Sequence, residues 1–202
     1  MVTAVVSNAV PRTSWMLTRL ATETHTHHAA IDSALGATVR DPTLGGYRYL
    51  LARIYGFEAP VANALSATRG LDAEFARRRA RASWLAADLI ALGLTRAEHG
   101  LLARRHEVPR LDGAPEGLGW LYVLEMISLR VTPLRARLHE KVLTVAGSYL
   151  MTARDAATRD LGATLDLVTH TPTIAKRIVA GAHDGFDSLR RWLASTPPWD
   201  GF

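Results

Sequence analysis

Residues 21–35 read "ATETHTHHAAIDSAL" and place three histidines, His25, His27 and His28, within four positions. Apolar residues before and after them recur at steps of three and four, which is typical of a helix with one buried face. The buried stripe is predicted to contain Leu17, Leu20, Thr24, His28, Ile31 and Leu35. His28 is therefore predicted to face the core, while His27, about 100° further around the helix, is predicted to face water.

An inward histidine has two interpretations, and the spacing alone leaves both open. His28 can be a core residue whose ring nitrogens are satisfied by hydrogen bonds. A neutral imidazole on an apolar wall is also what an iron ligand requires. A zinc site is less favoured, because no carboxylate accompanies the histidine pairs at a fixed spacing.

Helical patterns and breakers continue through the rest of the chain, and Val/Ile/Thr alternation typical of strands is missing. Breaks are predicted at 36–46, after a helix over about 71–92, in the loop 108–117, at Pro133 and at "THTPT" (169–173). The segment "GFEAP" (56–60) is predicted to bend or end the second helix. The sequence thus predicts an all-α, single-domain bundle of roughly six to eight helices over residues 15–195. Residues 1–14 are interpreted as a flexible arm and 196–202 as a tail.

Composition excludes several functional classes. The chain has no cysteine, which removes disulfides, thiolate metal sites and cysteine nucleophiles, and favours a cytoplasmic protein. No apolar run approaches the ~20 residues that span a bilayer, so no membrane role is expected. The net charge is +5, with basic runs at 76–81 and 101–110. The arginines of these runs alternate with Ala, Leu and acids, so the runs are interpreted as solvated helix faces. No nucleic-acid partner is therefore expected. An anionic small ligand would suit the positive net charge.

Five motifs in collinear order resemble the heme oxygenase family, in the bacterial branch that includes enzymes paired with bacteriophytochromes. The family's T-x-x-x-H followed by an acid is matched by Thr24, His28 and Asp32. Its Y-x-x-L-L-x-x-x-Y-G-F-x-x-P is matched by "YRYLLARIYGFEAP" (47–60). Three further family motifs follow in order: D-L-x-x-L-G at 88–93, G-x-L-Y-V-L-E at 119–125 and A-x-x-x-F-x-x-L-x-x-W at 182–192.

The resemblance implies a heme oxygenase-like helical fold in which His28 is the proximal ligand of heme iron. It also implies that heme is both cofactor and substrate, cleaved to biliverdin, carbon monoxide and iron with electrons from a donor protein, within a bacteriophytochrome system. For the heme propionates, the family usually has a cation seven residues before the histidine. This sequence has Ala21 there, and Arg19, Tyr122, Lys176 and Arg177 are the candidates in its place.

One segment departs from the family pattern. L-Y-V-L-E is followed in the family by a glycine-rich G-S-x-L-G-G, whereas this sequence reads "MISLRV", with Met126 and Arg130 among the replacements. Glycine permits close backbone approach to a ligand, and longer side chains fill that space. Met126 and Arg130, four residues apart, are predicted to lie over the same pocket, so turnover of heme is predicted to be slow or absent.

Two alternatives to catalysis follow from this departure. The protein can be a non-catalytic heme or bilin binder, with Met126 as a sixth ligand, or a regulatory member of the fold acting through its surface. Di-iron chemistry would need inward acids and a Glu-x-x-His motif. Glu125 is a candidate acid, but no Glu-x-x-His occurs.

Overall fold

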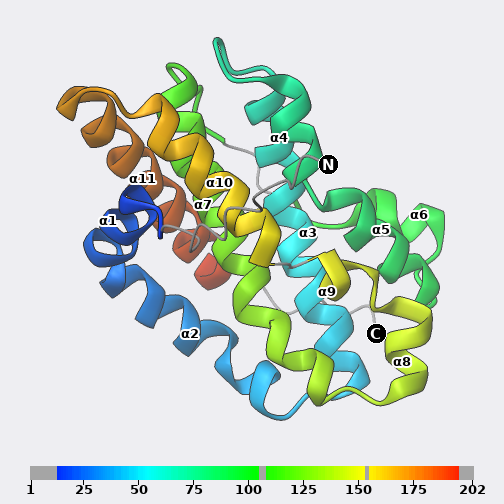
Figure 1. Ribbon diagram of the computed structural model, residues 1–202. Coiled ribbons are helices and arrows are strands. Elements are labelled where there is room, and N and C mark those ends of the chain that lie inside the picture. Colours follow the sequence, from blue (N-terminus) through cyan, green and yellow to red (C-terminus); the bar gives the residue numbers. More distant parts are fainter. Residues whose placement is uncertain (1–12, 105–107, 153–154, 196–202) are drawn as a thin grey trace, which may run out of the picture.

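The structure is a computed structural model that describes residues 13–104, 108–152 and 155–195. Every regular element within these ranges is helical, which confirms the predicted all-α class, and no strand occurs there (Figure 1). In chain order the elements are α1 (Trp15–Glu23), α2 (His25–Arg40), α3 (Leu44–Ser66), α4 (Ala73–Arg79), α5 (Ala82–Ala91), α6 (Arg96–Leu101), α7 (Ala114–Val131), the 3₁₀ helix η1 (Thr132–Ala136), α8 (Glu140–Ala146), α9 (Ser148–Thr152), α10 (Asp155–Val168) and α11 (Pro172–Ser195).

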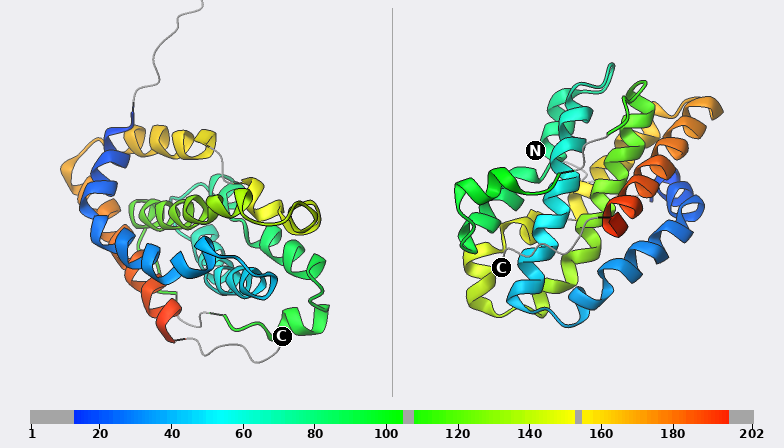
Figure 2. Two further views of the ribbon diagram at one scale, coloured as in Figure 1. Left: turned by 90° about the horizontal axis from the view of Figure 1, so that it is seen from below. Right: turned by 180° about the vertical axis from the view of Figure 1, so that it is seen from behind.

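Helix α7 lies in the middle of the molecule with the other helices around it (Figures 1 and 2). Residues 117–128 of α7 are buried without a gap, as expected for a helix that is apolar on all sides. Its most extensive neighbour is α11. The two helices cross closely because each has a glycine at the contact. A Cβ on Gly119 would lie 2.3 Å from the carbonyl oxygen of Ile178, and one on Gly181 would lie 2.5 Å from that of Glu116.

Two predicted helices are each divided in the structure. The first stops at Glu23 and restarts at His25, with Thr24 at φ −105°, ψ 14° between α1 and α2. The predicted helix over about 71–92 is two helices, α4 and α5, separated by Ala80 in an extended conformation and Arg81. These breaks, and several short helices late in the chain, give more helical segments than the six to eight predicted.

The second predicted helix is longer than expected, since α3 runs through Pro60 to Ser66. A proline inside a helix removes one backbone hydrogen bond. Burial offsets that loss here, because Phe57, Val61 and Leu65 on either side of Pro60 are almost completely buried. Of the two outcomes predicted for 56–60, a bend or an end of the helix, the end is wrong. The expected stop at Pro133 is confirmed, because α7 ends at Val131. Helix α11 begins at Pro172, within the break predicted at 169–173.

The predicted arm and tail fall mainly outside the described residues. Ser14, at the end of the arm, is buried and accepts a hydrogen bond from the backbone N–H of Leu17, which caps α1. Its hydroxyl donates to Asp166 of α10 at 2.7 Å. This contact joins the start of the described chain to α10. No helix among the described residues combines the length and apolar character needed to cross a membrane.

Candidate functional site

The three histidines at the start of α2 have different surroundings. His28 is half-buried and its ring lies edge-on to Phe186 of α11, with centroids 5.2 Å apart. Ile31 and Leu35, on the same stripe, are buried as predicted. His25 is exposed and contacts the Thr22 carbonyl. His28 thus faces inward, toward α7 and α11.

His27 does not face water, which corrects the sequence prediction. Its side chain is 18% exposed, stacks on Phe186 with centroids 5.5 Å apart, and lies 2.9 Å from Nδ1 of His183. The break at Thr24 ends the continuous stripe on which the prediction was based, and α2 packs against α11 along a side that includes both histidines. Among the described residues, no group of three or more His, Asp or Glu side chains is arranged to hold a metal ion.

The imidazole of His28 is neutral over most of the pH range. Burial and the nearby Arg130 guanidinium lower its pKa to about 4. Its Nε2 lies 3.0 Å from the Thr24 hydroxyl and 3.3 Å from that of Tyr122. The Thr24 hydroxyl donates to the Leu20 carbonyl, so a hydrogen bond to His28 requires the imidazole to donate from Nε2. In that tautomer the lone pair needed for iron is absent from Nε2.

The α7 candidates line one side of that helix at steps of four. Tyr122 is buried beside His28, and burial raises the pKa of its hydroxyl. Met126 is 9% exposed. Arg130 reaches across to α2, where its Nε lies 2.8 Å from Oδ1 of Asp32 as an ion pair. The guanidinium is thus held at the α2–α7 edge, one turn of α2 beyond His28.

The other predicted propionate ligands lie on other elements. Arg19 of α1 pairs with Glu23 one turn later, with 2.6 Å between Nε and Oε1. Lys176 is exposed near the start of α11. Arg177 forms a two-point contact with Glu116 at the start of α7, including 2.9 Å between Nη2 and Oε2. The two arginines are engaged in these pairs rather than gathered around His28.

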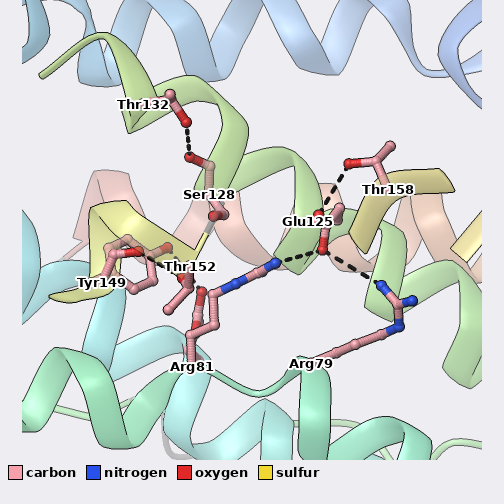
Figure 3. A network of polar contacts seen from close by, with 9 residues as sticks. Arg79, Arg81, Glu125, Ser128, Thr132, Tyr149, Thr152 and Thr158 are labelled. Carbon is pink, nitrogen blue, oxygen red and sulfur yellow. Dashed lines mark hydrogen bonds and ion pairs between the residues drawn. The ribbon is translucent and has the colours of Figure 1, made fainter. Parts of the chain in front are cut away.

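A second polar centre, which sequence reasoning missed, lies at Glu125 of α7, three residues after Tyr122 (Figure 3). Glu125 is 1% exposed, and its Oε2 accepts from Nη2 of Arg81 at 2.7 Å and lies 3.9 Å from Nη1 of Arg79. Thr158 of α10 donates to Oε1 at 3.1 Å. The run at 76–81 was predicted to be a solvated face, and that is wrong for its two buried arginines, Arg79 and Arg81.

The break between α4 and α5 explains this convergence. Residues two apart on a continuous helix point about 200° away from each other. Ala80 is extended (φ −72°, ψ 121°), so the chain turns and both Arg79 and Arg81 reach Glu125. No Gly or Pro marks this break in the sequence, and Glu125 is 44 positions from Arg81. The pairing therefore leaves no local sequence signal.

Glu58 adds a second buried carboxyl near this centre. It is completely buried, accepts a hydrogen bond from the Tyr149 hydroxyl at 3.1 Å, and has no partner for Oε2 among the described residues. Burial raises its pKa to about 7, against the opposing effect of the Arg81 charge. Tyr149 is fixed in turn by Asp88, whose carboxylate accepts the backbone N–H groups of Ser148 and Tyr149 at the start of α9.

Comparisons with protein-family models, curated proteins and solved structures give no match to this chain.

Proposed function

We propose that this protein binds heme where α2, α7 and α11 meet, with Nε2 of His28 as the iron ligand, on a heme oxygenase-like fold. The observation that carries the proposal is the inward position of His28, whose Nε2 is directed toward α7. Its low pKa supports the same role, because a neutral imidazole ligates iron. The aromatic ring of Phe186 supports an apolar surrounding for a porphyrin.

A neutral imidazole is a suitable ligand for heme iron, but two contacts must open before heme can bind. The Tyr122 hydroxyl and the Thr24 hydroxyl lie at the nitrogen that iron would occupy. Heme supplies an iron centre able to carry electrons and bind diatomic ligands. The chain's part is to release Nε2 from Thr24 and Tyr122, to switch the proton of His28 to Nδ1, and to exclude water with α7 and α11.

Slow or absent oxidation of heme follows from the residues on α7. Met126 replaces a family glycine, and its thioether is the proposed sixth ligand. A His/Met pair would leave no open position for oxygen. The proposal is therefore a heme binder with weak or no biliverdin-forming activity, and its alternative is a non-catalytic bilin-binding or regulatory protein. An electron-donor protein or a bacteriophytochrome system is the partner that the oxygenase activity would require.

Titration of heme into the purified protein, followed by its visible spectrum, tests the ligand. We expect a saturable Soret shift at one heme per chain, lost in His28→Ala and retained in His25→Ala. His25 is the matched control because it is exposed on the same turn, whereas His27 packs on Phe186. Equal loss in both variants, or no shift in the natural protein, overturns the proposal. Addition of reductant in air then measures turnover. Rapid formation of biliverdin would contradict the proposal that Met126 and Arg130 leave no room for oxygen.

A further inference from the structure

A pocket of about 450 Å³ lies at the junction of α4 and α5, beside α9 and α10. It is lined by Arg78, Arg79, Arg81, Trp84 and Phe75, with Thr152 and Asp160 on the remaining sides. This volume is in the range of small-molecule sites. The pocket is distinct from the surroundings of His28, because its lining includes none of the residues that contact His28, which are Thr24, Tyr122 and Phe186.

Arg81 gives the pocket a preorganised donor. Its side chain is 5% exposed and its Nη2 is fixed on Glu125. Its Nη1 is buried and has no hydrogen-bond partner among the described residues. Arg81 is part of the lining of the pocket, so its fixed positive charge favours an anion there. Glu125 is itself held by Thr158, so the guanidinium does not need to be ordered when a ligand binds.

Charge at the mouth of the pocket favours the same kind of ligand. Arg78 is exposed and lines the pocket, and Arg79 lies within it, stacked with its guanidinium carbon 4.5 Å from the centre of the Phe75 ring. Asp160 is an acidic residue of the lining and opposes a highly charged ligand. A single phosphate or carboxylate therefore fits this lining better than a polyanion such as a nucleic acid.

An apolar surface continues from the pocket. Trp84, 50% exposed, lines this pocket and also a neighbouring hollow of about 470 Å³. Leu143 and Met151 lie in that second hollow, and Met151 is 51% exposed. The indole thus stands between the cationic pocket and a hollow of mixed apolar and hydroxyl lining, where a planar ring can stack.

We infer that this pocket binds a small organic anion, with one phosphate or carboxylate on the arginines and an aromatic body against Trp84. The juxtaposition of the three arginines of the lining with the exposed Trp84 carries this inference. It does not depend on heme binding at His28.

Calorimetric titration of the full chain with phenyl phosphate, 1-naphthyl phosphate, benzoate, inorganic phosphate and phenol tests it. We expect saturable binding of the aromatic anions, tighter for 1-naphthyl than for phenyl phosphate, weaker for inorganic phosphate and absent for phenol. Comparison of phenyl phosphate with benzoate distinguishes a phosphate ligand from a carboxylate ligand. Higher salt should weaken binding, because the contact is between charges.

Single substitutions test which residues of the pocket bind the anion. Arg78→Gln should weaken the binding of phenyl phosphate about tenfold, as expected for one lost charge-assisted hydrogen bond. Arg77→Gln is the matched control, since Arg77 is its neighbour on α4 but pairs with Glu74 outside the pocket. Trp84→Ala should remove the preference for the naphthyl ring. Arg81→Lys retains the charge beside Glu125 and removes Nη1, and should also weaken binding.

Circular dichroism and thermal unfolding of each variant show whether it is folded. Equal effects of Arg77→Gln and Arg78→Gln would overturn the inference, because they would indicate a general charge effect. Binding of phenol as strong as that of phenyl phosphate, or no heat with any aromatic anion at millimolar concentration, would also overturn it. If Arg81→Lys fails to fold, Arg78→Gln and Trp84→Ala still decide the outcome.

Discussion

The hydroxyl of Tyr122 on α7 lies 3.3 Å from Nε2 of His28 on α2. This contact occupies the nitrogen that an axial ligand would use, together with the hydroxyl of Thr24. A net hydrogen bond contributes about 1 kcal/mol, or about a fivefold change in an equilibrium. If heme binds at His28 as we propose, its affinity is set by competition at this one atom.

Tyr122→Phe should tighten heme binding by about fivefold, because it removes one competing contact at Nε2. Heme titration of the two proteins measures this difference. Tyr49→Phe on α3 is the control, since no hydrogen bond of the Tyr49 hydroxyl is present in the described structure. A gain that persists in the His28→Ala background would show that Tyr122 acts elsewhere.

Replacement of Met126 and Arg130 by glycine should raise the turnover of heme to biliverdin. The double variant opens space beside α7, and each glycine costs about 1 kcal/mol of helix stability. Release of Arg130 also leaves Asp32 without its partner, but Asp32 is 58% exposed and remains hydrated. Biliverdin absorbance under a reductant in air is the measurement. Leu129→Gly loosens the same helix without touching either position, and should leave turnover unchanged.

Glu58→Gln should flatten the dependence of stability on pH between about 4.5 and 7. The folded pKa of Glu58 is about 7, above its ordinary value of 4.5, so the folded protein retains a proton that the unfolded chain loses. Stability from this group is fully present below pH 4.5 and is lost as the pH rises through 7, by an amount on the order of 3 kcal/mol. Urea unfolding at pH 5 and pH 8 measures it. An unchanged pH profile in Glu58→Gln would mean that another group is responsible.

Glu125→Gln should destabilise the protein by about 3–5 kcal/mol, because it leaves Arg81 buried without a countercharge. Glu74→Gln is the matched control. It breaks the exposed pair with Arg77, whose side chain is 68% exposed, and should cost less than about 1 kcal/mol. Urea unfolding at pH 7 compares the two. Replacement of both members, as in Arg81→Met with Glu125→Leu, should recover much of the loss, since the buried charges are removed together.

Hydrophobic periodicity was sufficient to predict the all-α class and the inward side of Ile31 and Leu35, and the proline itself predicted the helix boundary before Pro133. It did not predict the breaks at Thr24 and Ala80, because neither residue is a strong helix breaker and tertiary packing decides both. At the candidate site, the inward orientation of the His28 side chain was predicted correctly. The burial of His27 and the Arg81–Glu125 pair were missed because both depend on contacts between distant helices, which no local spacing encodes.

The close crossing of α7 and α11 has a consequence for synthesis of the chain. Helix α7 is buried on nearly every side, yet its main partner is completed only at Ser195, 64 residues after Val131. At a translation rate of about 5–20 residues per second, roughly 3 to 13 seconds separate the two. During that interval the apolar surface of α7 has no α11 to cover it. The nascent chain should therefore be a substrate for ribosome-associated chaperones, and a chain truncated before α11 should aggregate.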